Sequence, residues 1–248
     1  MKETRLLMGM PITVEIVDAS ASHAAIDAVY DYFEYIDATF STYKEDSEIS
    51  RINRREIGPA EFSADMRTVL ALSELTRQET GGYFDIARNG INDPSGLVKG
   101  WAIDQAAEIL RQKGFRNFYV DAGGDIQAVG KNGRGQDWRV GIRNPFDIAG
   151  IVKVIAISDR GVATSGTYIR GQHIYNPQGA APLDTDIVSL TVIGPDVYEA
   201  DRFATAAFAM GHAGIFFIEN LEDFEGYMID QSRQGTFTRN FEKYVCHA

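Results

Sequence analysis

The chain has 248 residues, with 24 lysines and arginines against 35 aspartates and glutamates, so its formal net charge is −11. Its 44% of hydrophobic residues is typical of globular proteins and excludes an intrinsically disordered chain. A single cysteine, Cys246, excludes a disulfide framework, and no apolar run approaches the ~20 residues of a membrane span. The negative charge argues against nucleic-acid binding as the main role, although backbone N–H groups or a metal ion can still hold a small anion.

The N-terminal residues show no sign of a leader peptide. Residues 1–7 are charged and mixed in character, and an alternating pattern typical of a strand follows at residues 11–17. A secretory signal would need a basic segment, an apolar core and a small-residue cleavage site in that order. We therefore expect a cytoplasmic protein.

Helical and strand patterns then follow one another without the regular alternation of a parallel α/β sheet. Apolar spacing predicts helices over residues 22–40, 63–80, 100–113 and 198–210, whereas residues 39–53 are polar and typical of a loop. Short apolar runs predict strands over residues 117–121, 138–142, 151–157, 161–164 and 189–193. A helical turn at residues 216–218 and a hairpin over residues 226–230 and 235–238 end the chain. This mixture indicates an α+β fold.

The polar segment before the third predicted helix is a candidate anion site. It contains Asp93, Ser95, Gly96 and Lys99. A glycine-containing loop that leads into a helix offers unpaired N–H groups to an anion, and Lys99 adds a positive charge. The same residues also have the composition of an ordinary turn, and their local pattern slightly favours that interpretation.

Two further segments carry possible ligand contacts. Asp201 and Thr205 are four residues apart in a predicted helix, so their oxygen atoms share one face, which suits Mg²⁺ beside phosphates. The alternative is a helix-start aspartate and a threonine bonded to its own backbone. Gly123 and Gly124 follow a predicted strand, where they permit either a close approach to a ligand or a tight turn.

His173 is the histidine best placed for proton transfer. It lies in a polar segment soon after Ser165, and an imidazole can accept a proton near neutral pH. The alternative is that His173 only hydrogen-bonds its own loop to a neighbouring strand. The sequence contains neither an HExxH motif nor a cluster of Cys and His, which argues against zinc.

Taken in order, these segments resemble the ApbE family of FAD:protein FMN transferases. The matching segments are Met8-Gly9, residues 40–53 (FSTYKEDSEISRIN), 81–86 (GGYFDI), 93–104 (DPSGLVKGWAID), 120–126 (VDAGGDI), 163–168 (ATSGTY), 173–179 (HIYNPQG) and the run from 189 to 211. The resemblance implies one compact α+β unit over residues 1–248, related to the T-fold, with mixed or antiparallel sheets packed with helices. It also implies Mg²⁺-dependent transfer of FMN from FAD to a threonine or serine hydroxyl of an acceptor flavoprotein, with release of AMP.

The same resemblance implies roles for individual residues. Asp201, Thr205 and the backbone carbonyl of Gly96 would hold Mg²⁺, and His173 would deprotonate the acceptor hydroxyl. The FAD site would be lined by Met8, Tyr43, Tyr83, Phe84, Asp85, Asp93, Lys99, Tyr175 and Ala204.

The chain also departs from the family pattern. The segment between Gly166 and His173 is short, Asn176 replaces the usual aspartate, and only residues 87–92 separate two motifs that are usually far apart. Two alternatives therefore stay open: an Mg²⁺-dependent FAD pyrophosphatase that gives FMN and AMP, and a non-enzymatic flavin-binding protein. Tyr43 favours the transferase over the pyrophosphatase, and the pair Asp201 and Thr205 argues against a carrier without a metal site.

Overall fold

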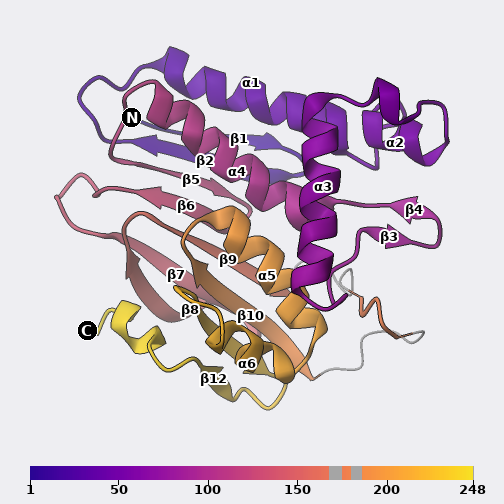
Figure 1. Ribbon diagram of the computed structural model, residues 1–248. Coiled ribbons are helices and arrows are strands. Elements are labelled where there is room, and N and C mark those ends of the chain that lie inside the picture. The colour runs from indigo at the N-terminus through magenta and orange to yellow at the C-terminus, as the bar shows by residue number, and fades with distance from the viewer. Residues whose placement is uncertain (168–174, 180–185, 248) are drawn as a thin grey trace.

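An eight-stranded sheet forms the centre of the computed structural model, which describes residues 1–167, 175–179 and 186–247 (Figure 1). Its strand order is β1-β2-β5-β6-β9-β10-β11-β12, and all neighbouring strands pair antiparallel. The strands are β1 (Lys2–Leu7), β2 (Met10–Ile16), β5 (Phe118–Ala122), β6 (Asp125–Val129), β9 (Arg160–Gly166), β10 (Ile187–Gly194), β11 (Glu225–Asp230) and β12 (Gly235–Phe237).

Helices cover one face of this sheet, and a long hairpin covers the other (Figure 1). The helices are α1 (His23–Phe40), α2 (Glu48–Asn53), α3 (Ala64–Glu79), α4 (Ser95–Gln112), α5 (Val197–Ala209) and α6 (Ala213–Glu219), with short 3₁₀ turns at Pro59–Glu61 and Phe241–Tyr244. The long hairpin joins β7 (Trp138–Asn144) to β8 (Asp147–Ile157), and a small hairpin joins β3 (Ala87–Arg88) to β4 (Ile91–Asn92). The α+β class expected from the sequence is therefore confirmed.

The helices form where apolar spacing and polar caps agree. In α1 the buried residues Ile26, Val29, Phe33 and Ile36 recur every three or four positions, which places them on one face against the sheet. The Ser22 side chain accepts a hydrogen bond from the Ala25 N–H at the start of this helix. Asp196 caps α5 in the same way, since its Oδ1 accepts from the Glu199 N–H at 2.8 Å.

The structure differs from the sequence-based expectation at the start of α4. This helix begins at Ser95 rather than at Gly100, so the segment expected to be a loop or turn is its first turn. The Asp93 carboxylate accepts a hydrogen bond from the Ser95 N–H, and Leu97 and Val98 are buried against the core. The sequence does not predict this first turn as helical, because its residues are mostly polar or glycine and the helical apolar spacing becomes regular only after it.

Other elements were also not expected from the sequence, among them α2, β1, β6 and the small β3–β4 hairpin. The loop expected over residues 39–53 contains α2, whose N-terminus is capped by Ser47. Residues 2–7 form β1, an edge strand stabilised by its ladder with β2 and by the ion pair between Lys2 and Glu15. Residues 125–129 form β6, which is joined to β5 by the turn at Gly123 and Gly124.

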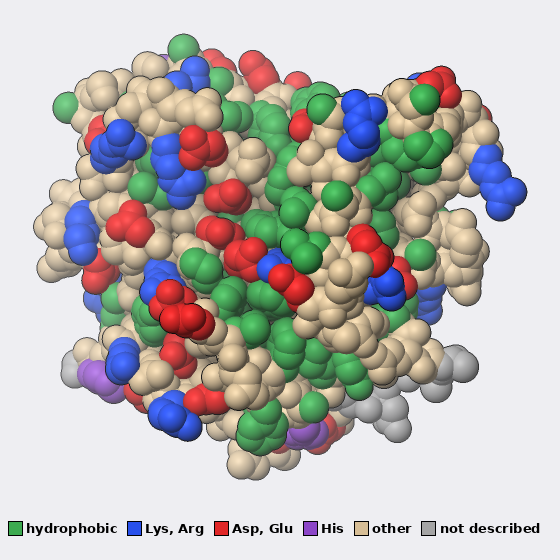
Figure 2. All heavy atoms as spheres, viewed as in Figure 1, with side chains coloured by type: hydrophobic (Ala, Val, Ile, Leu, Met, Phe, Trp, Pro, Cys, Tyr) green, Lys and Arg blue, Asp and Glu red, His purple; other side chains and the backbone are tan. Residues whose placement is uncertain are grey.

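The surface of the helical face is mixed in character. Figure 2 shows lysine and arginine side chains scattered among acidic and hydrophobic ones on this face, rather than gathered in one area. None of the helices in the described part of the chain combines the length and the hydropathy that a membrane-spanning segment requires.

We predict that Asp104 of α4 destabilises the fold near neutral pH. Burial raises its pKa to about 6, repulsion from Asp196 adds to the shift, and Arg111, 3.7 Å away, opposes it. Because the folded-state pKa lies above the value of about 4 in the unfolded chain, stability falls as the pH rises from about 4 to 6. Asp104→Asn should raise the free energy of unfolding by about 1–2 kcal/mol at pH 7.5.

Urea denaturation at pH 7.5 and pH 4 measures this effect. The gain should vanish near pH 4, where the carboxyl is protonated in both states. Asp31→Asn, at an exposed position of α1, is the matched control and should change stability by less than about 0.5 kcal/mol at either pH. An equal gain at both pH values would contradict the assigned cause.

Candidate functional site

A cavity of about 540 Å³ lies where the start of α4 meets α5, the β1–β2 turn, the β5–β6 turn and the end of β9. The chain segment from Tyr83 to Asp93 and the residues Tyr175 and Pro177 complete its wall. The lining is thus drawn from both halves of the chain. Its volume falls within the ~300–1,000 Å³ typical of sites for small molecules and cofactors.

A buried ion cluster forms the base of the cavity. The Lys99 ammonium contacts the Asp125 carboxylate and lies 3.5 Å from Asp201 Oδ1. Asp201 Oδ2 accepts a hydrogen bond from the Gly100 N–H at 2.8 Å, and Asp125 Oδ1 accepts one from the Thr164 N–H at 3.0 Å. Asp125 and Asp201 are both buried, so these contacts are shielded from bulk water.

Burial is the dominant influence on Asp201. It raises the pKa of this carboxyl above the ordinary aspartate range, whereas the ammonium of Lys99 lowers it and Asp125 raises it further. Burial makes the ionised form of this carboxyl costly, so a further cation that binds beside it would stabilise the ionised form.

Neutral oxygen atoms lie next to this carboxylate. Thr205 is one helical turn after Asp201, and its Oγ1 donates to the Gly96 carbonyl at 3.3 Å. Ser165 Oγ lies 3.5 Å from the same hydroxyl. A carboxylate, a hydroxyl and a carbonyl are hard oxygen donors of the kind that Mg²⁺ takes, usually together with water and substrate phosphate.

Among the described residues, no group of three or more His, Cys, Asp and Glu side chains converges as a metal centre. A metal ion at this site would therefore rest on Asp201, on neutral oxygens and on the ligand itself. That arrangement fits Mg²⁺ better than a zinc site, which needs several nitrogen or sulfur ligands. The residues present thus fit the ion that the resemblance implies.

Aromatic residues form another wall of the cavity. The Tyr175 hydroxyl donates to the backbone carbonyl of Asp85 at 2.5 Å, and the Arg88 guanidinium lies 4.5 Å from the centre of the Tyr175 ring. Phe84 is buried beneath Gly96, where an added Cβ would come within 3.4 Å of the ring. This wall is apolar and planar enough to contact a ring system.

The structure brings most of the sequence-predicted site residues together. The cavity is lined by Tyr83, Phe84, Asp85, Asp93, Gly96, Lys99, Tyr175, Asp201 and Thr205. The side chains of Asp85 and Asp93 accept hydrogen bonds from the N–H groups of Ala87 and Ser95, so both carboxylates also organise their own turns.

Three predicted contacts are not part of the lining. Tyr43 follows α1 and is 97% exposed, whereas Ala204 is fully buried in the core between α5 and the sheet. Met8 packs partly against the core in the β1–β2 turn, next to Gly9, which does line the cavity. The roles of these three residues in FAD binding stay predictions. His173 lies outside the described residues.

Sequence reasoning missed Asp125, Thr164 and Arg143 as lining residues. A signal existed for Asp125, which directly follows the two glycines. Gly123 and Gly124 have φ angles of +65° and +105°, so they form the tight turn that the sequence left open, and this turn places Asp125 at the cavity. Arg143 comes from β7, and no local pattern predicts which part of the chain that hairpin contacts.

Comparison with known proteins identifies related sequences over most of the chain. The model of the ApbE family matches residues 8–93 and 88–228. The FAD:protein FMN transferase of Haemophilus influenzae is 26% identical over 313 residues, which cover 96% of this chain and 90% of that protein. The protein of the same name from Escherichia coli K12 is 26% identical and covers 86% of this chain and 78% of its own length.

Solved structures share the fold. The flavin transferase ApbE from Vibrio cholerae superposes with a TM-score of 0.85 at 23% identity, covering 98% of both chains. The ApbE protein from Thermotoga maritima superposes with a TM-score of 0.86 at 20% identity, covering 100% of this chain and 99% of the other.

We predict that Gly100→Ala disrupts the base of the cavity. A Cβ at this position would lie 2.6 Å from Asp201 Cβ and 2.7 Å from the Val197 carbonyl oxygen, so α4 and α5 would have to separate. This overpacking should outweigh the gain of up to ~1 kcal/mol in helix propensity and lower the free energy of unfolding by about 1–2 kcal/mol.

Chemical denaturation measures the loss of stability. Gly58→Ala is the matched control, since a Cβ there meets no atom within 4 Å, and it should stay within about 0.5 kcal/mol of the unaltered chain. Equal stability of the two variants would show that the helices tolerate the added methyl group.

Proposed function

The chain belongs to the ApbE family, and we propose that it transfers FMN from FAD to a threonine or serine hydroxyl of an acceptor flavoprotein, with Mg²⁺ as cofactor and AMP as the second product. The observation that carries this proposal is the convergence of Lys99, Asp201, Thr205 and the Gly96 carbonyl beside an aromatic wall in one cavity. FAD carries an anionic pyrophosphate, which a cation stabilises, and a flavin ring, which packs against planar apolar side chains. Both kinds of contact are available in this cavity.

The reaction replaces the phosphoanhydride bond of FAD with a phosphate ester of the acceptor hydroxyl. The acceptor oxygen forms a bond to the phosphorus of the FMN half, the bond from that phosphorus to the bridging oxygen breaks, and AMP leaves with the bridging oxygen. The hydroxyl proton must pass to a base, for which we propose His173. When bound by Asp201, Thr205 and the Gly96 carbonyl, Mg²⁺ would supply Lewis-acid polarisation of the pyrophosphate.

The chain's own residues have three tasks in this reaction. Lys99 offsets one of the two carboxylate charges at the base of the cavity, where Mg²⁺ and the anionic pyrophosphate would lie. Tyr83, Phe84 and Tyr175 would hold the flavin and exclude water from that wall. The Gly123–Gly124 turn has no side chains and so leaves room for the ligand to approach the backbone.

The transfer assay is the direct test. The protein is incubated with FAD, Mg²⁺ and candidate acceptor flavoprotein domains encoded near its gene, and the products are separated on a denaturing gel. Covalent flavin fluorescence in an acceptor domain supports the proposal, and AMP should form in equal amount. Release of FMN and AMP without labelling would indicate a pyrophosphatase, and FAD binding without any product would indicate a flavin carrier.

The cytoplasmic location and the single-domain organisation over residues 1–248 stay predictions of the sequence.

We predict that Asp201→Asn lowers FMN transfer by at least about 10²-fold, because it removes the one charged oxygen donor among the proposed Mg²⁺ ligands. The amide nearly preserves side-chain size, so the fold should persist. Initial rates against Mg²⁺ concentration measure the effect, and Asp31→Asn serves as the exposed control. Unchanged Mg²⁺ dependence would show that the metal ion binds elsewhere.

We predict that His173→Ala slows the transfer step by about 10²-fold, the usual contribution of a positioned general base. FAD affinity, measured by calorimetry, should change less than about threefold, since the proposed role concerns the acceptor hydroxyl. Single-turnover labelling of a saturating acceptor domain isolates this step. A wild-type rate would remove His173 from the chemistry.

A further inference from the structure

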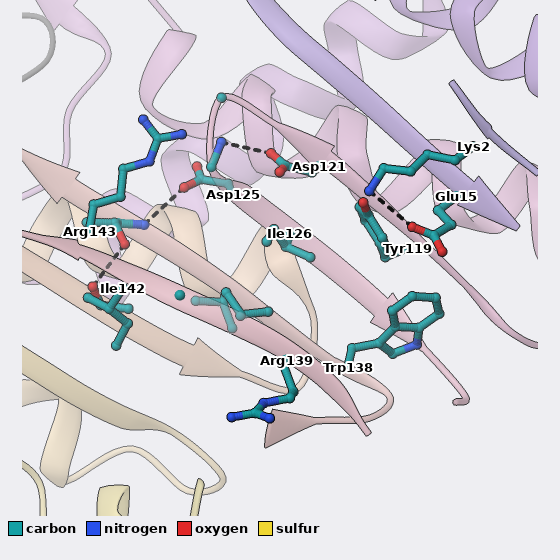
Figure 3. Close-up of a pocket in the computed structure, with 17 residues that line it drawn as sticks. Lys2, Glu15, Tyr119, Asp121, Asp125, Ile126, Trp138, Arg139, Ile142 and Arg143 are labelled. Carbon is teal, nitrogen blue, oxygen red and sulfur yellow. Dashed lines mark hydrogen bonds and ion pairs between the residues drawn. The ribbon is translucent and has the colours of Figure 1, made fainter. Parts of the chain in front are cut away.

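A second cavity of about 410 Å³ lies on the opposite face of the sheet, between the sheet and β7 (Figure 3). Its floor is the face of the central sheet, and it shares the β5–β6 turn, Thr164 and Arg143 with the proposed active site. In Figure 3, Trp138 lies at the end near Tyr119 and Lys2, and Arg143 lies at the end near Asp125. The cavity therefore follows β7 lengthwise and ends at the proposed active site.

One wall of the cavity is the backbone edge of β7 that does not pair with β8. Every residue from 138 to 143 lines the cavity, although side chains of a strand alternate between its two faces. By contrast, β5 contributes only the alternate residues Tyr119 and Asp121, as expected for the face of a sheet. A wall that includes consecutive residues is made by the backbone edge.

The hydrogen-bond pattern of the hairpin shows which backbone groups point to this cavity. Gly141 lies opposite Val154, and the Val154 carbonyl accepts a hydrogen bond from the Cys246 N–H on the side away from β7. In an antiparallel pair, opposite residues either bond to each other or both point outward. The N–H and C=O of Gly141 therefore point away from β8, and so do those of Arg139, two residues earlier.

This edge has no strand partner among the described residues, where β7 pairs with β8 alone. Outward N–H and C=O groups at every second residue are a template for another strand. Arg139 and Arg143 are both exposed, and neither forms an ion pair with a described residue. The carboxylates that line the cavity, those of Glu15, Asp121 and Asp125, belong to the sheet. Burial raises the pKa of Asp121, and Arg143 is close enough to oppose that rise. The two guanidinium groups instead lie on the exposed side of β7, so they favour acidic side chains on an occupant that pairs with β7.

We propose that the edge of β7 receives an extended, acidic segment of the acceptor polypeptide as an added strand, which leads the acceptor hydroxyl into the active site. This inference rests on the proposed transferase function. Six residues of β7 give a track of about 20 Å at the usual rise of ~3.3 Å per residue, and the track ends at Arg143, which lines both cavities. Backbone pairing supplies affinity in this mode of recognition, and flanking charges supply selectivity.

Arg139→Pro against Arg139→Ala tests the backbone contact. Both variants remove the guanidinium, but only proline removes the outward N–H, which the β7–β8 ladder does not use. With an acceptor domain that the unaltered protein labels, we expect the acceptor KM of Arg139→Pro to be about 10-fold above that of Arg139→Ala. The Kd for FAD should agree within about twofold between the two variants.

Amide hydrogen exchange of the unaltered protein is the second measurement and does not depend on proline being tolerated. We expect the amides of Arg139 and Gly141 to exchange at least about 10-fold more slowly after the acceptor domain is added, and to be unaffected by FAD alone. Protection by FAD alone, or a weaker FAD affinity of Arg139→Pro than of Arg139→Ala, would show that the cavity holds part of the dinucleotide and would overturn the proposal.

Different results would overturn the proposed function and the docking strand. If the unaltered protein labels no acceptor, the proposed function fails and this inference fails with it. If the unaltered protein labels the acceptor domain, while Arg139→Pro and Arg139→Ala share one KM and both amides exchange at unchanged rates, only the docking strand is overturned.

Discussion

The close contact of α4 and α5 at Gly100 is the constraint on which the proposed active site depends. Because Gly100 has no side chain, α4 and α5 can approach closely enough for the Asp201 carboxylate to accept a hydrogen bond from the Gly100 N–H. Lys99 and Gly96 then lie on the same part of α4, and Thr205 lies one turn further along α5. One backbone contact thus brings the charge and the oxygen donors to the same point.

Much of the fold could be predicted because local patterns and tertiary packing agree there. The apolar spacing of α1 and α3 predicted both helices to within about two residues at each end, as did the alternation in β2. The first turn of α4 and the strand β1 could not be predicted in this way. Their stability comes from Leu97 and Val98 packing on the core and from the ladder with β2, which are contacts with distant segments.

The residues of the candidate site likewise fall into those that local spacing predicts and those that only tertiary contacts bring together. Asp201 and Thr205 are linked by helical spacing, so the sequence alone places their oxygens on one face. The ion cluster of Lys99 with Asp125 crosses from a helix to a strand, and no spacing rule joins residues so far apart. The ApbE resemblance supplied nine of the residues that line the cavity, whereas Arg143 reaches it only because the β7–β8 hairpin packs against the sheet.

Charge is the remaining constraint on a flavin dinucleotide in this protein. The overall charge of −11 repels an anionic ligand at long range, but salt screens that repulsion beyond about 8–10 Å at physiological ionic strength. Within the cavity, one ammonium meets two buried carboxylates, so the cluster by itself does not attract a pyrophosphate. A divalent cation at Asp201 would reverse the sign of the local charge where the phosphates must lie. The same acidic residues that oppose FAD alone would therefore favour FAD together with Mg²⁺, and binding of the proposed ion and of the dinucleotide would then be cooperative.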